Sequence, residues 1–98
     1  MKITEYTPTP EYLYHDHLKR RKDAIKQACI FIEQADAKTG RLLREKTLSR
    51  KDRNRLWWGI QCDRELSIKA IQLADQHARA AARILSTNPR MEVEITPV

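Results

Sequence analysis

The fold is decided by residues 50–86, which read RKDRNRLWWGIQCDRELSIKAIQLADQHARAAARILS. This stretch holds one glycine and no proline, the two residues that most often interrupt regular structure. Its apolar side chains recur at intervals of three, four or seven residues, which is the spacing of one face of an α-helix. The pattern predicts one long helix that buries the following stripe: Leu56, Ile60, Leu66, Ala70, Leu73, Ala74, Ala78, Ala81, Ile84 and Leu85.

Signals for the ends of this helix stand beside it. Ser49 is a favourable N-cap, and Asp52 follows three residues later in a variant of the capping box. Pro89 disfavours helix at the residue before it, so we expect the helix to end near Asn88. Gly59 is expected to bend the helix just after two tryptophans.

A first helix is predicted from Thr9-Pro10-Glu11, where Thr9 can cap the helix and Pro10 suits its first position. Gly40 is a natural C-terminal stop, which leaves residues 41–48 as a short helix or a linker. The stripe expected to be buried contains Tyr14, Leu18, Ile25, Cys29 and Ile32, flanked by Ala24, Ala28, Phe31 and Ala35.

Together these elements predict an all-α protein, an antiparallel hairpin of two long helices in a single domain over residues 1–98. Residues 1–9 and 89–98 are expected to be extended ends, and their alternating patterns around Ile3, Tyr6 and residues 91–95 leave open a short β-ribbon. A two-helix hairpin buries little apolar surface. Either a dimer that forms a four-helix bundle or a short third helix would supply more.

Composition narrows the class of protein. Of the 98 residues, 41% are hydrophobic and 33% are charged, which is typical of a folded chain. No apolar run is long enough to span a membrane, and the first residues lack the apolar segment of a signal peptide. We therefore expect a cytoplasmic location. Cys29 and Cys62 have no metal-binding spacing and are expected to be buried thiols.

The charge is strongly positive and unevenly distributed. The formal net charge is +6, and the positive residues form one short run at 19–22 and a longer one at 41–55. Clustered positive charge attracts phosphates, acidic protein surfaces or anionic lipids. We define this basic patch as Lys19, Arg20, Arg21, Lys22, Arg41, Arg44, Lys46, Arg50, Lys51, Arg53 and Arg55.

Two adjacent tryptophans stand out within the second helix. Neighbours on a helix point about 100° apart, so both rings cannot face one core. Tryptophan is a frequent anchor at interfaces, so at least one ring should contact a partner or another part of the fold. The predicted partner-binding surface follows the same helix edge and comprises Trp57, Trp58, Gln61, Arg64 and Ile68.

Two groups of residues resemble reactive sites. His15-Asp16-His17 resembles a metal-binding fragment, but residues two apart on a helix diverge by about 200°. Asp63, Ser67 and His77 have the composition of a hydrolase triad, but no glycine-rich elbow accompanies them. We interpret these three as hydrogen-bonding groups at the helix interface, and we predict no catalytic residue, metal or cofactor.

In overall style, being short, basic and almost wholly helical with strand-like ends, the chain resembles small accessory proteins from the early regions of temperate bacteriophages. That resemblance implies a non-enzymatic modulator or inhibitor that docks on a host protein of replication, recombination or defence. Two alternatives stay open. The basic patch could bind DNA or RNA directly, or the hairpin could be a structural subunit of a helical bundle.

Overall fold

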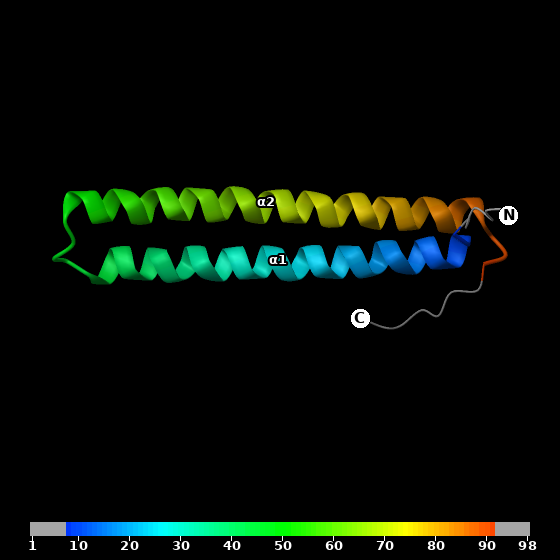
Figure 1. Ribbon diagram of the computed structural model, residues 1–98, viewed down its shortest axis with the longest axis horizontal. Helices are drawn as coiled ribbons and strands as arrows, with labels where there is room; N and C mark the ends of the chain where they lie inside the picture. The colour runs from blue at the N-terminus through cyan, green and yellow to red at the C-terminus, as the bar shows by residue number, and fades with distance from the viewer. Residues whose placement is uncertain (1–7, 92–98) are drawn as a thin grey trace, which may run out of the picture.

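The computed structural model describes residues 8–91, and these form two long helices. Helix α1 spans Pro10–Arg44, and helix α2 spans Arg50–Thr87. The helices run antiparallel, side by side, and a loop of residues 45–49 joins them at one end (Figure 1). The predicted all-α hairpin is therefore confirmed, and residues 8–91 contain no third helix and no strand.

The predicted capping residues start both helices. The Tyr12 backbone N–H donates to the Thr9 side chain at 3.2 Å, and Pro10 is the first residue of α1. The Asp52 backbone N–H donates in the same way to the Ser49 side chain at 3.1 Å. Asn88 caps the C-terminal end of α2, one residue before Pro89. Side-chain oxygens thus satisfy backbone donors that a helix start leaves without an internal partner.

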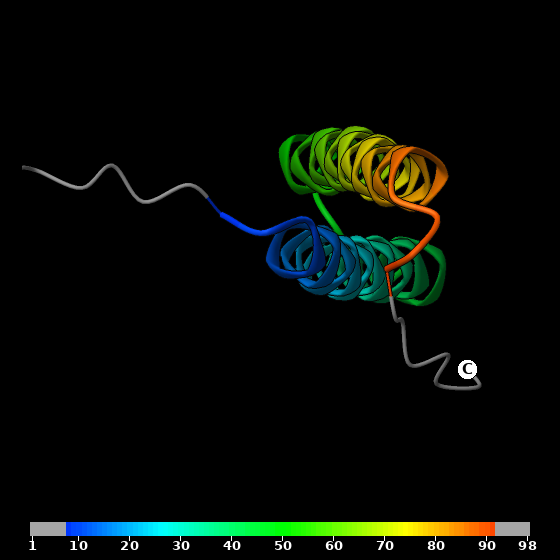
Figure 2. The same cartoon turned by 90° about the vertical axis from the view of Figure 1, so that its right-hand side faces the viewer.

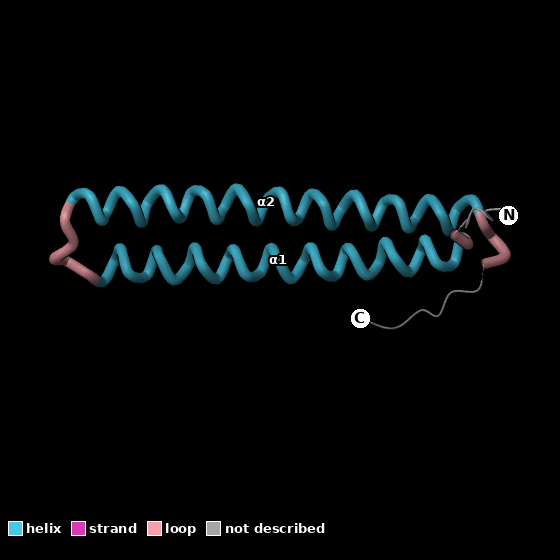
Figure 3. Tube along the Cα trace, viewed as in Figure 1, coloured by secondary structure: helices cyan, strands magenta, loops and turns pink. Residues whose placement is uncertain are grey.

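Neither glycine acts as predicted. Gly40 does not end α1, which continues for four more residues to Arg44, and Leu42 is half-buried in this last turn. Gly59 does not bend α2, which is one continuous helix over Arg50–Thr87 with no sharp bend along its trace (Figure 3). A Cβ atom at Gly59 would lie 3.2 Å from Cδ of Lys38. Glycine therefore makes room there for a lysine side chain that crosses from α1.

The interface between the helices follows alternating steps of four and three residues, as in a coiled coil. Its buried hydrophobic residues are Ala24, Ala28 and Ala35 from α1, with Ile60, Ala74 and Ala81 from α2. Seen along their length, the two helices form one layer, with no further described element above or below it (Figure 2). Each helix therefore buries one narrow stripe and leaves the rest of its surface uncovered.

This core is narrower than the predicted one: its six buried hydrophobic residues all belong to the predicted stripes, but several larger members of those stripes do not. The larger residues predicted to be buried on α1, Ile25 and Ile32, are 40% and 44% exposed. On α2, Leu66 and Leu73 are also exposed. Alanines take the interface positions because a methyl side chain lets two helix backbones approach closely. Each one contributes no more than about 1 kcal/mol of burial energy.

Two polar contacts cross this alanine interface. The Lys38 ammonium lies 2.6 Å from a carboxylate oxygen of Asp63, whose side chain is only 8% exposed. Further along, the Nδ1 atoms of His17 and His77 lie 3.0 Å apart, so that one ring donates a hydrogen bond to the other. Asp63 and His77 therefore each bond to a residue of the other helix, as predicted. Ser67 instead donates to the Arg64 carbonyl of its own helix.

The remaining expectations have separate outcomes. Both cysteines are free and exposed, so the prediction of buried thiols is wrong. Cys29 follows the buried Ala28 and Cys62 precedes the buried Asp63, so each thiol points away from the interface.

The predicted terminal strands lie outside the described residues, apart from Met91. Within the described part, neither helix is long and apolar enough to cross a membrane.

Breaking the Lys38–Asp63 pair tests its role in the core. We expect Lys38→Met to lower the free energy of unfolding by about 2–3 kcal/mol, because it leaves a nearly buried carboxylate without a partner. The double variant Lys38→Met/Asp63→Leu should recover to within about 1 kcal/mol of the parent, since no buried charge remains. Urea denaturation followed by circular dichroism measures both values. A double variant no more stable than the single one would contradict this account.

The two glycines offer a matched comparison. We expect Gly40→Ala to raise the free energy of unfolding by about 0.5–1 kcal/mol, because the residue lies inside a helix and an added Cβ meets only the flexible Arg44 side chain. Gly59→Ala should give less or no gain, because its Cβ would press on the Lys38 side chain. Thermal unfolding measures the order of the two variants.

Candidate functional site

Most of the net positive charge lies where the two helices join. We call this region the basic tip and define it by seven exposed residues: Arg41, Arg44, Lys46, Arg50, Lys51, Arg53 and Arg55. Within residues 41–55 the only carboxylates are Glu45 and Asp52, so the region carries a net +5 of the chain's +6. Arg41 pairs with Glu45 at 3.1 Å, but that contact is exposed and leaves the overall charge unchanged.

The second run of predicted basic residues lies elsewhere. Lys19, Arg20, Arg21 and Lys22 are all exposed, but along α1 they are about 28–33 Å from Arg41 at 1.5 Å per residue. Arg20 pairs with Asp16 at 3.0 Å. The hairpin thus divides the predicted basic patch into two separate surfaces, and the basic tip is much the larger.

Both tryptophans project from α2 beside the basic tip. Trp57 is 47% exposed and Trp58 is 63% exposed. Their rings meet edge to face, with centroids 5.0 Å apart. The two indoles therefore shield each other in part, but helix α1 does not enclose them. A large apolar pair thus lies at the surface beside the largest cluster of positive charge among the described residues.

The other predicted partner-binding residues continue from Trp57 along α2, away from the basic tip. Gln61 is half-buried, whereas Arg64 and Ile68 are exposed. Ile68 lies about 16 Å from Trp57 along the helix. These residues share an edge of α2 with Trp57, but they approach the middle of the hairpin. Arg64 and Ile68 therefore have a different set of neighbouring side chains from that of the tryptophans.

That set is an uncovered apolar face that the sequence prediction missed. In an antiparallel pair, a two-fold rotation relates the helices, so equivalent positions beside the interface lie on the same broad side of the hairpin. The helical spacing places one group of exposed apolar residues from both helices on this side. We define the apolar face as Ile25, Cys29, Ile32, Ile68 and Ile71. The seven-residue recurrence of Ile25 and Ile32 was the available signal, but it was interpreted as core.

The residues that resembled reactive sites do not assemble. Asp63 contacts Lys38, while His77 contacts His17, and Ser67 lies about 15 Å from His77 along α2. These three therefore form no triad. His15 packs edge to face against Tyr14, and His17 faces the other helix. Among the described residues, no group of three or more His, Cys, Asp or Glu side chains could hold a metal ion.

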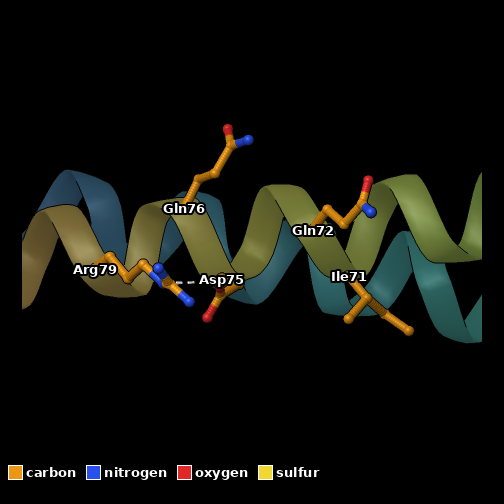
Figure 4. A pocket seen from close by; sticks show the side chains of 5 residues that line it. All are labelled: Ile71, Gln72, Asp75, Gln76 and Arg79. Carbon is orange, nitrogen blue, oxygen red and sulfur yellow. Dashed lines mark ion pairs between the residues drawn. The ribbon is translucent and has the colours of Figure 1, made fainter.

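A hollow on the outer side of α2 offers little room for a small molecule. It is lined by Ile71, Gln72, Asp75, Gln76 and Arg79 (Figure 4). All five come from one helix, so the hollow is an open groove. In the same view Ile71 and Asp75 project toward one edge of the helix, whereas Gln72 and Gln76 project toward the other. The view also shows the Asp75–Arg79 ion pair, 2.9 Å long.

Comparison with family models, with curated proteins and with solved structures finds no match to this chain.

The exposure of the indoles predicts that they contribute little to folding. We expect Trp57→Ala/Trp58→Ala to keep the helix content and to lower the free energy of unfolding by no more than about 1–2 kcal/mol. Ile60→Ala is the matched comparison, because Ile60 is buried in the interface two residues further on. It should cost about 2–5 kcal/mol. Circular dichroism in urea measures both, and loss of folding in the tryptophan variant would place the rings in the core.

Proposed function

We propose that this chain is a non-catalytic binding protein that docks through its hairpin end on the acidic surface of a partner protein. Trp57 and Trp58 act as the anchors. The cations of the basic tip attract the partner and orient its approach, as complementary charges do in fast protein association.

The observation that carries the proposal is that the exposed indole pair lies beside the basic tip, where residues 41–55 carry a net charge of +5. Tryptophan and arginine are the residues most enriched among those that dominate binding energy at interfaces. Large aromatic rings held on a helix also lose little conformational freedom when a partner covers them. Aromatic anchors ringed by cations suit a partner surface with an apolar pocket bordered by carboxylates.

The sequence prediction goes further and names the partner as a host protein that processes nucleic acid, with this chain as its modulator or inhibitor. That remains a prediction. It fits the charge, because an acidic region on such a partner would attract the basic tip. The partner prediction requires no metal or cofactor, and it involves no membrane.

Direct binding of DNA or RNA is the second candidate, and the same region favours it. Exposed cations can neutralise phosphates, and a free indole face can stack on an unpaired base. The edge-to-face contact of the tryptophans argues for the protein partner, because each ring already covers part of the other. A base would have to stack on the surface that remains.

Dependence on salt separates the two candidates. Affinity for nucleic acid falls steeply as salt rises, because each neutralised phosphate releases counterions. We expect the protein to bind a short DNA duplex or a single-stranded RNA only at low salt, as measured by fluorescence anisotropy. Capture of a protein partner from nuclease-treated extract should persist at physiological salt and should be lost in Trp57→Ala/Trp58→Ala.

Ile30→Ala is the matched control for the capture experiment. Ile30 is an exposed apolar residue of α1 that lies away from the basic tip, so its loss should leave capture intact. Tight binding of nucleic acid at physiological salt, with quenching of tryptophan emission and no nuclease-resistant partner, would replace the proposal by the second candidate. Equal loss of capture in both variants would show that the indoles have no specific role.

A further inference from the structure

The uncovered apolar face points to an occupant beyond the partner at the basic tip. Ile68 and Ile71 are 55% and 52% exposed, and Ile25 and Ile32 flank Cys29 on the other helix. We propose that a second copy of this chain covers this face, with the two hairpins packed face to face as a symmetric four-helix bundle. In this dimer α1 packs against the partner's α1 in the opposite direction.

The size of the face suits such a contact. Two adjacent helices, each about 10 Å wide and about 50 Å long, present a surface of roughly 1,000 Å². A stable protein interface covers about 800 Å² on each partner. The hairpin also needs the additional burial, because five of its six buried hydrophobic residues are alanines. Covering four isoleucines per copy supplies apolar burial that the alanine interface lacks.

The charges at the border of the face make it complementary to itself. Toward one end lie Lys22 and Asp75, and toward the other lie Asp36 and Arg64. A two-fold axis that runs perpendicular to the helices, near Cys29, places each end of the apolar face of one copy over the opposite end of the same face in the other copy. Lys22 then approaches Asp36 of the partner subunit, and Arg64 approaches Asp75 of the partner subunit, within about one helical turn. Each positive group meets a negative one.

The opposite broad side of the hairpin lacks this property. There the exposed Leu66 and Leu73 of α2 lie beside Gln27 and Gln34 of α1, and Lys69 occupies the middle. A symmetric contact through that side would bring two Lys69 ammonium groups together. The absence of any charge at the centre of the apolar face therefore selects it.

The basic tip selects between the two ways in which the apolar faces could meet. A two-fold axis parallel to the helices would place both tips side by side, each with a net charge of +5. The axis across the helices places them at opposite ends, about 50 Å apart. Like charges repel, so the second arrangement is the stable one. It also places Cys29 close to Cys29 of the partner subunit.

Two neighbouring substitutions test the dimer. Light scattering after size exclusion should give twice 11.5 kDa for the parent chain. Ile71→Gln should weaken the dimer about tenfold or more, because the change occurs twice across the symmetric contact. Leu73→Gln is the matched control, with similar exposure on the opposite side of the same helix, and it should remain dimeric. A monomeric parent, or equal dissociation in both variants, would overturn the proposal.

Thiol oxidation tests the direction of the axis without altering the apolar residues. A disulfide requires Cα atoms within about 7 Å of each other, which the axis near Cys29 permits. With Cys62→Ser, a mild oxidant should join two copies through Cys29. With Cys29→Ser, the equally free and exposed Cys62 should not cross-link. Cross-linking of both variants to the same extent, or of neither, would overturn the antiparallel dimer even if Ile71→Gln fails to fold.

Discussion

The close contact of alanine methyl groups along the hairpin is the constraint on which the rest of the structure depends. Ala28 and Ala35 on α1, with Ala74 and Ala81 on α2, recur at seven-residue intervals and keep one narrow stripe in register. Two helices that approach through such small side chains cannot also enclose large ones. The isoleucines and leucines beside the stripe are therefore left on the two broad sides, where their burial depends on another molecule.

Polar groups in the interface give this uniform stripe a defined alignment. Methyl groups alone would allow one helix to slide past the other by a turn at little cost. The Lys38–Asp63 ion pair and the His17–His77 hydrogen bond each require one particular alignment, and they lie in different parts of the hairpin. Gly59 supports the same alignment, since a side chain there would obstruct the lysine that reaches Asp63.

The sequence predicted the helices, their antiparallel arrangement and both N-caps, because capping and periodicity are local properties. The choice of buried face was predicted less well. Weighting residues by size placed Ile25 and Ile32 in the core, whereas helix approach depends on small residues such as Ala28 and Ala35. The tryptophans and cations were correctly expected at the surface. The grouping of Ile25 and Ile32 with Ile71 depends on how the helices face each other, which no single helix encodes.

The five-residue connection at 45–49 has a mechanical consequence. It is a short, direct link between the two helices. The start of α1 and the end of α2 lie together at the far end (Figure 1). The hairpin is therefore an elongated unit whose two outer helix ends lie at the same end (Figure 1). A domain fused at the far end of α2 would lie about 45 Å from the two indoles, so the length of the hairpin sets the spacing between the two attachments.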